Sequence, residues 1–216
     1  WRARKLWPGR TAFILGGGPS LLAMDLRPIH QQRVIGCNDA YLLGGWVDCC
    51  IFGDEPWWKH HKYGDLVDYS GLKVSIHDCT LGVPGIKTLQ RRSTGIWTVP
   101  GTIGWNQSTG AAAVNLAIIF GAVRIILLGF DMKFRATQAI GSGYPDDLRW
   151  RAKGSQINWH KNIREQTPGH HDGFRRAFGQ MKSSIDALGV EVFNATPDSA
   201  LKTFPAISLS EAIDLC

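Results

Sequence analysis

Three consecutive glycines, Gly16, Gly17 and Gly18, interrupt an apolar run near the start of the chain and are followed by Pro19 and Ser20. Residues without side chains let a phosphate or a sugar approach the backbone, and a helix that starts just after them offers unpaired N–H groups to an anion. The turn has neither the lysine of a phosphate-binding loop nor a complete dinucleotide-binding fingerprint. It therefore predicts a nucleotide site unlike that of P-loop NTPases or NAD-dependent dehydrogenases, with a tight structural turn as the alternative.

Further polar residues follow apolar runs or begin an apolar helix. Those that could contact a ligand beside the glycine turn are Asn38, Asp39, Asp54, Ser108, Thr109, Gly110 and Asp131. The carboxyl ends of parallel strands and the N-termini of the following helices meet at one edge of a sheet, so we expect these groups to lie together. With the glycine turn they outline a nucleotide pocket, in which Ser108 or Thr109 caps the apolar helix.

His170 and His171 are the candidates for a general base, because imidazole titrates near neutral pH. They precede a helical pattern, so either ring can project over the pocket while Asp172 caps the helix. Solvated side chains are the alternative. A metal site is a further alternative, because His160, His170, His171 and Asp172 are of metal-ligand type, although their spacing is irregular.

The composition favours one globular domain with an anionic partner. The 216 residues, 44% of them hydrophobic, suffice for one sizeable core. No apolar run approaches the roughly 20 residues of a membrane span. Five cysteines without metal-ligand spacing predict buried reduced thiols and a cytoplasmic location. The net charge of +6 favours a nucleotide phosphate or a nucleic acid as partner. Trp1 stands where a methionine is expected, which suggests a start upstream.

Apolar runs alternate with glycine turns and helical segments, the pattern of βαβ units around a parallel sheet. The predicted strands are 11–15, 33–37, 47–52, 123–128 and 190–193, and the predicted helices are 20–26, 111–120, 174–188 and 209–215. Gly121 and Gly189 end two of these helices. We therefore expect an α/β protein, a single Rossmann-like domain over residues 1–216, with a mainly parallel twisted sheet and helices on both faces.

The stretch 133–168 is long, polar and rich in glycine and basic residues. Compact domains usually keep such a stretch as a lid or a binding loop. We expect a lid over the pocket, with a disordered surface insertion as the alternative.

Four ordered motifs resemble those of the bacterial sialyltransferases of glycosyltransferase family 42 and of related phage and bacterial Rossmann-fold proteins. Gly16 to Leu21 resembles their first-strand Gly-Asn-Gly-Pro-Ser-Leu, and Cys37-Asn38 resembles their second-strand Cys-Asn. Ser108 to Asp131 resembles their Ser-Gly helix and the strand Gly-Tyr-Lys-Glu-Ile-Tyr-Leu-Gly-Ile-Asp. Ala195 to Leu201 resembles their Cys-Pro-Asn-Ser-Leu-Leu. Four motifs in order are far more specific than any one of them.

The resemblance implies transfer of a sugar from a nucleotide-activated donor, CMP-sialic acid in that family, by displacement with inversion and without a metal or a resident cofactor. It implies that Asn38 contacts the donor nucleotide or phosphate and that Ser108 or Thr109 binds the donor phosphate. It also implies that His170 removes the proton of the acceptor hydroxyl. The acceptor would be a glycan or, given the basic charge, a modified base in DNA.

Two positions depart from the family's pattern. Gly17 stands where the family has Asn, and Lys133 stands where it has one of two tyrosines that steady the departing phosphate. Tyr144 is the candidate for the other tyrosine. A lysine neutralises a leaving phosphate by charge where a phenol donates a hydrogen bond. We therefore still expect a phosphate leaving group, while these two departures leave the donor unidentified.

Two other functions fit the same residues. One is a pyrophosphokinase that binds a nucleoside triphosphate with Mg²⁺ on carboxylates such as Asp54 and Asp131. The other is a nucleotide- or nucleic-acid-binding phage protein that has kept the fold without the chemistry, which the residues Gly17 and Lys133 would allow. Stabilisation by ATP only in the presence of Mg²⁺ would favour the first of these over a sugar transferase.

Overall fold

The structure is a computed structural model that describes residues 1–133 and 168–216. The predicted lid at 133–168, and Tyr144 within it, lie outside the described residues except for the end positions Lys133 and Pro168. His160, considered above as a metal ligand, also lies outside them.

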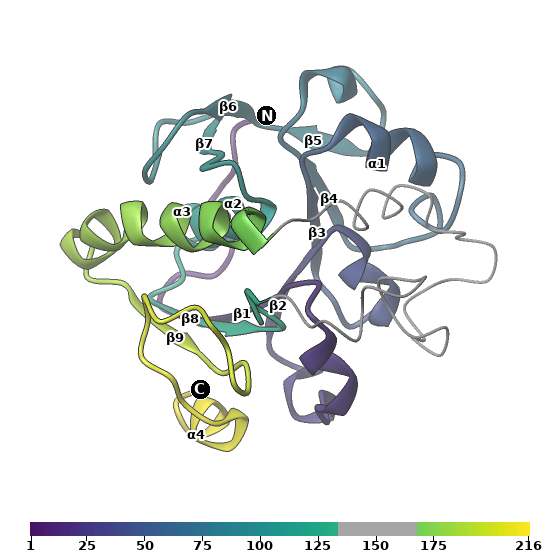
Figure 1. Cartoon of the computed structure of the whole chain (residues 1–216). Helices are drawn as coiled ribbons and strands as arrows, with labels where there is room; N and C mark the ends of the chain where they lie inside the picture. Colours follow the sequence, from purple (N-terminus) through teal and green to yellow (C-terminus); the bar gives the residue numbers. More distant parts are fainter. Residues whose placement is uncertain (134–167) are drawn as a thin grey trace.

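Within the described residues, seven strands form one parallel sheet in the order β5-β4-β3-β2-β1-β8-β9 (Figure 1). Their bounds are β1 (Thr11–Leu15), β2 (Arg33–Cys37), β3 (Cys49–Phe52), β4 (Leu72–Ser75), β5 (Ile86–Thr88), β8 (Arg124–Leu128) and β9 (Glu191–Asn194). The central strands are apolar along nearly their whole length, because both faces of a parallel sheet are covered. The predicted α/β class with a mainly parallel sheet is confirmed.

Helices cover both faces of the sheet (Figure 1). The α-helices are α1 (Glu55–His61), α2 (Thr109–Phe120), α3 (Pro168–Ala187) and α4 (Leu209–Asp214), and the 3-10 helices are η1 (Pro19–Ala23), η2 (Arg27–Ile29), η3 (Asn38–Leu43) and η4 (Asp78–Thr80). Alternate side chains of a strand point to opposite faces. Ile14 and Leu127 therefore pack with α2 and α3, while Phe13 and Ile126 pack with η1, η2 and α4. A separate small sheet pairs β6 (Gln90–Arg92) with β7 (Thr102–Gly104).

The ends of α2 lie where local sequence predicts them. Ser108 is the N-cap, and its Oγ accepts a hydrogen bond from the Ala111 N–H at 3.3 Å. Gly121 follows the helix in the left-handed conformation (φ 91°), which side chains disfavour. Of the two caps predicted, Ser108 and Thr109, Ser108 is the one used. Because β8 follows α2 and runs parallel to β1, the N-terminus of α2 comes to the carboxyl edge of the sheet.

The direction in which strands are added reverses between β1 and β8. From β1 the chain adds β2, β3, β4 and β5 on one side, then crosses through α2 and places β8 on the other side of β1. At such a switch point the loops after the two central strands diverge, and ligands of open parallel sheets bind between them. The loop after β1 is the glycine turn, and the loop after β8 contains Asp131.

Two predicted elements begin or end at least two residues inside their predicted bounds. The strand predicted at 47–52 begins at Cys49. The helix predicted at 20–26 is a 3-10 helix that ends at Ala23, because the backbone of Met24 returns to the extended conformation (φ −96°, ψ 134°). Its five residues form too short an element to build the dipole of a full α-helix.

The prediction that Asp172 caps a helix is wrong. The apolar spacing that defines the predicted helix starts at Phe174, but α3 begins earlier, at Pro168. Asp172 therefore lies inside the helix, where it pairs with Arg175 one turn further on. The first turn of a helix needs no apolar residue, so the apolar spacing could not locate this end.

The cysteines divide into two groups. Cys37, Cys49 and Cys50 are buried free thiols, as predicted, and burial raises the pKa of each. Cys79 and Cys216 are exposed, which corrects the prediction for these two. Among the described residues, no helix combines the length and the apolar character needed to cross a membrane.

Candidate functional site

The glycine turn packs directly against the loop that follows β8. The Gly16 N–H donates to the Leu128 carbonyl and the Gly18 N–H donates to the Gly129 carbonyl, each at 2.8 Å. A Cβ on Gly16 would lie 2.5 Å from the Gly129 oxygen, and a Cβ on Gly18 would overlap Oδ2 of Asp131. Two of the three glycines are therefore required by the close approach of two loops at the switch point.

Asp131 is a carboxylate only 4% exposed. Its Oδ2 accepts a hydrogen bond from Ser20 Oγ at 2.7 Å, and its backbone carbonyl accepts one from the Ala200 N–H at 2.9 Å. Its Oδ1 is buried and has no hydrogen-bond partner among the described residues. Pro19 is the first residue of η1, as predicted, and Gly17 is exposed. Because nearly all buried polar atoms are paired, the free Oδ1 marks Asp131 as a candidate ligand contact.

Asn38 follows β2, on the other side of β1 from Asp131. Its backbone is left-handed (φ 52°), and its Oδ1 is also buried without a partner among the described residues. In residues 1–133 and 168–216, the other non-glycine residues with left-handed backbones lie in loops that follow β7, β8 or β9: Asn106, Gln107, Met132 and Asp198. Backbone strain of this kind clusters at functional sites. Asn38, Met132 and Asp198 lie at the carboxyl edge of the seven-stranded sheet, while the other two residues follow β7 and precede α2.

The N-terminus of α2 reaches the same edge. Gly110 lies so close to the Phe130 ring that a Cβ would overlap it, and Phe130 immediately precedes Asp131. The first turn of α2 contains no acidic residue. Its N–H groups and the helix dipole therefore favour an anion there. Ser108 and Thr109, which begin this turn, are buried.

The start of α3 lies beside the loop that follows β8. Arg175 donates from Nη1 to the Met132 carbonyl at 2.6 Å, and the rings of Phe178 and Phe130 meet edge to face with centroids 5.7 Å apart. These contacts bring the first turns of α3, which contain the backbone of His170 and the half-buried His171, to the edge that carries Asp131.

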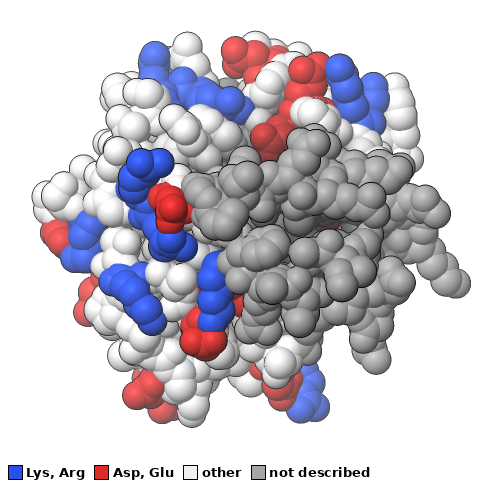
Figure 2. All heavy atoms as spheres, viewed as in Figure 1, with Lys and Arg blue, Asp and Glu red and all other residues white. Residues whose placement is uncertain are grey.

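Basic side chains accompany this edge. Lys133 forms an ion pair with Asp198, which joins the loop after β8 to the loop after β9. Figure 2 shows further Lys and Arg side chains over α3. A positive charge is thus held at the position where the resemblance predicts a phosphate-steadying group.

Asp54 and its neighbours form the next part of the edge, after β3. Burial raises the pKa of the half-buried Asp54 carboxyl, and nearby Arg91 and His77 oppose this shift. Arg91 donates to the Gly53 carbonyl at 2.6 Å and stacks over the Trp105 ring, 4.3 Å from its centroid. Arg91 also donates from Nε to the Ile76 carbonyl at 3.1 Å, so it joins the ends of β3 and β4 to the small sheet, and the sequence gives no sign of these contacts.

Asp39 follows Asn38 but is held in a buried network. Its Oδ1 accepts a hydrogen bond from Trp57 Nε1 at 2.6 Å and lies 3.2 Å from His61 Nε2. Tyr41 Oη lies 3.1 Å from His61 Nδ1, and burial raises the pKa of this phenol. Asp39 is 3% exposed. These contacts give Asp39, which the sequence suggests as a ligand contact, a structural role.

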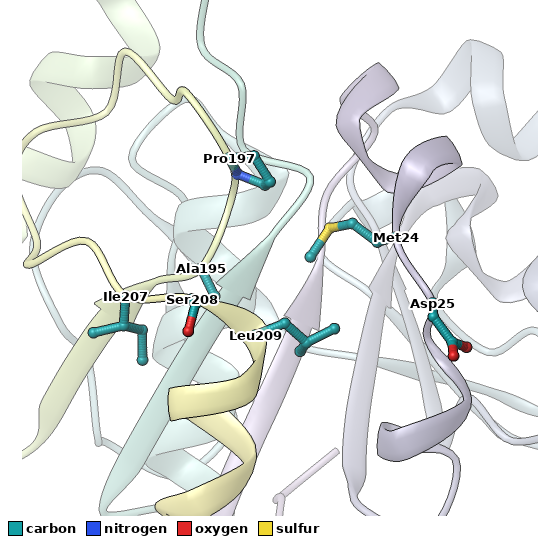
Figure 3. Close-up of a pocket in the computed structure, with 7 residues that line it drawn as sticks. All are labelled: Met24, Asp25, Ala195, Pro197, Ile207, Ser208 and Leu209. Carbon is teal, nitrogen blue, oxygen red and sulfur yellow. The ribbon is translucent and has the colours of Figure 1, made fainter.

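A mostly apolar pocket of about 470 Å³ lies between the end of η1 and the start of α4 (Figure 3). The residues around it are Met24, Asp25, Ala195, Pro197, Ile207, Ser208 and Leu209. Pro197 belongs to the last of the four predicted motifs, so that motif contributes to a cavity wall. The pocket itself was not predicted, because its two walls are about 170 residues apart in the sequence.

No family model and no curated protein matches the sequence. The fold does match solved structures of the sialyltransferase CstII from Campylobacter jejuni. The structure in complex with the substrate analogue cytidine-5'-monophosphate has a TM-score of 0.56 and 14% identity, over 93% of this chain and 86% of that chain. The structure in complex with CMP-3FNeuAc has a TM-score of 0.54 and 14% identity, over 92% and 86%. The chain has the fold of these sialyltransferase structures, as its motifs predict.

Proposed function

We propose that this protein is a glycosyltransferase that moves a sugar from a nucleotide-activated, CMP-sugar-like donor to an acceptor hydroxyl. The observation that carries the proposal is the convergence of the glycine turn, Asn38, Asp131 and the N-terminus of α2 at the switch point of the sheet. The same fold is found in an enzyme solved with CMP and with CMP-3FNeuAc. The edge offers hydrogen-bond acceptors and an anion-binding helix end, which together suit a nucleotide.

The donor phosphate is proposed to lie at the first turn of α2. Ser108, Thr109 and Gly110 begin this turn, which has no acidic residue to repel an anion. Lys133 is held near the same edge by its ion pair with Asp198. As the bond between the sugar and the phosphate breaks, helix dipole and lysine stabilise the charge that develops on the phosphate. This arrangement supports departure of the nucleotide without a metal.

The general base is proposed to be His170 or His171. An inverting displacement needs a base on the side of the sugar opposite the leaving phosphate, where it takes the proton of the acceptor hydroxyl as the new bond forms. The hydrogen bond from Arg175 to the Met132 carbonyl supports this assignment, because it holds α3 beside the loop that follows β8. Neither Ser108 nor Asp131 belongs to α3, so donor binding and proton removal come from separate elements.

A pyrophosphokinase in which Asp54 and Asp131 share a Mg²⁺ ion does not fit the strand order. These residues follow β3 and β8, which are separated by β2 and β1. Three strand spacings amount to about 14 Å, whereas ligands of one Mg²⁺ ion lie about 2 Å from it. Among residues 1–133 and 168–216, no group of three or more His, Cys, Asp or Glu residues could hold a metal ion.

Thermal-shift measurements with CMP, UDP, GDP and ATP, each with and without Mg²⁺, test the proposal. We expect stabilisation by a nucleoside mono- or diphosphate that does not depend on the metal, because a ligand that binds only the native state raises the melting temperature. Stabilisation by ATP alone, and only with Mg²⁺, would refute the proposed donor.

Transfer assays on single variants test the base. His170→Ala or His171→Ala should reduce transfer from a CMP-sugar by about 10²- to 10⁴-fold and leave CMP binding unchanged. His60→Ala, at an exposed position on α1, is the matched control and should keep full activity. Full activity in both test variants would rule out both histidines.

A further inference from the structure

Two stretches of the sequence, residues 1–24 and 79–130, contain no acidic residue. Together they hold eight of the 24 Lys and Arg residues and none of the 18 Asp and Glu residues, so the rest of the chain has a small excess of acid. The net charge of +6 therefore comes from about a third of the sequence. Charge of one sign that is gathered on one surface attracts a partner of the opposite charge.

The fold brings the two stretches together. The Trp7 N–H donates to the Phe120 carbonyl at 2.7 Å, and the two rings meet edge to face with centroids 4.8 Å apart. Residues 1–10, the basic arm, are thereby held against the C-terminal end of α2. The basic arm and the acid-free residues 86–123 beside it form the basic face. Figure 2 shows Lys and Arg side chains gathered over β6 and the N-terminus, which belong to this face.

The charges of the basic face are available to a partner. The basic residues on it that are exposed and form no ion pair among the described residues are Arg2, Arg4, Lys5, Arg10 and Lys87. The two stretches that form the face supply no acidic side chain to neutralise them. Charges of one sign repel each other, and an anionic partner relieves this repulsion.

Apolar side chains are exposed among these charges. Leu6, on the arm, is 48% exposed, and Val99 and Val123 are 57% and 47% exposed. The Val123 N–H donates to the Arg10 carbonyl at 3.1 Å, which places this valine beside the arm. Single exposed apolar residues are common on protein surfaces, but these three lie on the face that also gathers the unpaired charge.

A pocket of about 190 Å³ lies between the basic arm and α2. Ala3 and Lys5 line it on the side of the arm, and Val99, Ile118 and Ile119 contribute apolar side chains to the other walls. The pocket therefore combines an apolar lining with one cationic residue. A group that fits it has an apolar chain next to a negative charge.

We propose that the basic face binds the surface of an anionic lipid bilayer. Its Lys and Arg side chains attract acidic headgroups, while Leu6, Val99 and Val123 bury apolar surface at the boundary between headgroups and acyl chains. A nucleic acid would attract the same charges, but its phosphate backbone offers little to exposed apolar residues. The mixture of unpaired positive charge with exposed apolar side chains is what favours a lipid surface.

Sedimentation with lipid vesicles at about 100 mM salt tests the proposal. We expect the protein to bind vesicles of phosphatidylcholine with about 30% phosphatidylglycerol at least about 100-fold more tightly than pure phosphatidylcholine, because each Lys or Arg near an anionic bilayer raises the affinity about fivefold. The double variant Arg4→Gln with Lys5→Gln should bind the anionic vesicles about 25-fold more weakly. Arg176→Gln with Lys202→Gln removes the same charge from exposed positions outside the basic face and is the matched control.

The apolar contribution has its own variant. Leu6→Ser should bind the anionic vesicles about 10-fold more weakly, and the loss should persist at high salt, because burial of apolar surface is not screened. A duplex DNA oligonucleotide, titrated under the same conditions, is the competing probe. Leu6→Ser should leave any binding of this oligonucleotide unchanged.

Three results would overturn the proposal: no binding of the anionic vesicles, equal losses in the Arg4 and Lys5 variant and its control, or tighter binding of the oligonucleotide than of the vesicles. The last result would assign the basic face to nucleic acid. If a variant does not fold in thermal melts, the comparison of the two vesicle compositions with the wild-type protein still decides. Vesicle binding is measured without a nucleotide, so its failure leaves the proposed function standing.

Discussion

Asp39 and Asp131 are two buried aspartates in similar settings, 3% and 4% exposed, each just after a strand of the same sheet. Asp39 accepts a hydrogen bond from Trp57 and lies beside His61. Asp131 accepts one from Ser20 and has a second oxygen without a partner among the described residues. A carboxylate with its partners in place stabilises the fold, and one that lacks a partner is where a ligand is expected.

The difference follows from what packs above each strand end. After β2, α1 supplies Trp57 and His61, which close over Asp39. After β8, the nearest element is the glycine turn, which has no side chains to offer at Gly16 and Gly18. Residue type and burial are therefore the same for both aspartates, and only their hydrogen-bond partners tell them apart.

The largest expected effect on stability is at Asp39. Asp39→Ala should lower the free energy of unfolding by about 3 kcal/mol, the upper end of the range for a buried donor left unsatisfied, because the indole N–H of Trp57 loses its acceptor. Urea denaturation measures this value. Asp131→Asn removes a buried charge but can keep a hydrogen bond with Ser20, because the amide has both an acceptor oxygen and a donor N–H. This variant should change stability by less than about 1 kcal/mol. Equal losses in the two variants would contradict the distinction between the two aspartates.

A side chain at Gly18 tests the close approach of the two loops. Gly18→Ala should cost about 1–3 kcal/mol, the usual range for overpacking, because its Cβ would overlap Oδ2 of Asp131. CMP binding should weaken as well, since the carboxylate must move. Gly45→Ala is the matched control, because no atom lies within 4 Å of the added Cβ there. Thermal melts with and without CMP give both quantities, and a fully stable Gly18→Ala would refute the packing argument.

Comparing the N-cap serines of α2 and α4 tests whether the start of α2 binds the donor or only stabilises the helix. Ser108→Ala and Ser208→Ala each remove an N-cap hydrogen bond, from α2 and α4 respectively, and should each cost about 1 kcal/mol of stability. Of the two, only Ser108→Ala should also weaken CMP binding in calorimetry, because α2, unlike α4, begins where the donor phosphate is proposed to lie. Equal CMP affinities in the two variants would remove the phosphate from the first turn of α2.

The smallest expected effect concerns Asp54. Burial raises the pKa of its carboxyl above 3.8 in the folded protein. The folded state therefore binds the proton more tightly, and stability from this group is present below pH 3.8 and is lost as the pH rises through the folded pKa. Asp54→Asn should accordingly gain stability relative to the wild type as the pH rises from about 3.5 to 7. Urea denaturation across this range measures the gain, and a difference that does not change with pH would contradict it.

The sequence by itself determined the features that have local causes. Ser108 and Gly121 predict both ends of α2 because capping and left-handed turns depend on neighbouring residues. The apolar runs predict most strands, and the glycine turn is located by its own residues. The sequence also predicts that the polar residues after the strands lie along one edge of the sheet, because the carboxyl ends of parallel strands lie together.

Only the tertiary structure decided which polar groups are free. Ser20 and Asp131 are 111 residues apart, and Trp57 and Asp39 are 18 apart, so no local pattern shows that one carboxylate is satisfied and the other is not. Hydrogen bonds of buried groups depend on which elements the chain brings together. The contacts formed in the tertiary structure therefore distinguish the aspartate that is tied into the fold from the one with an oxygen that has no partner among the described residues.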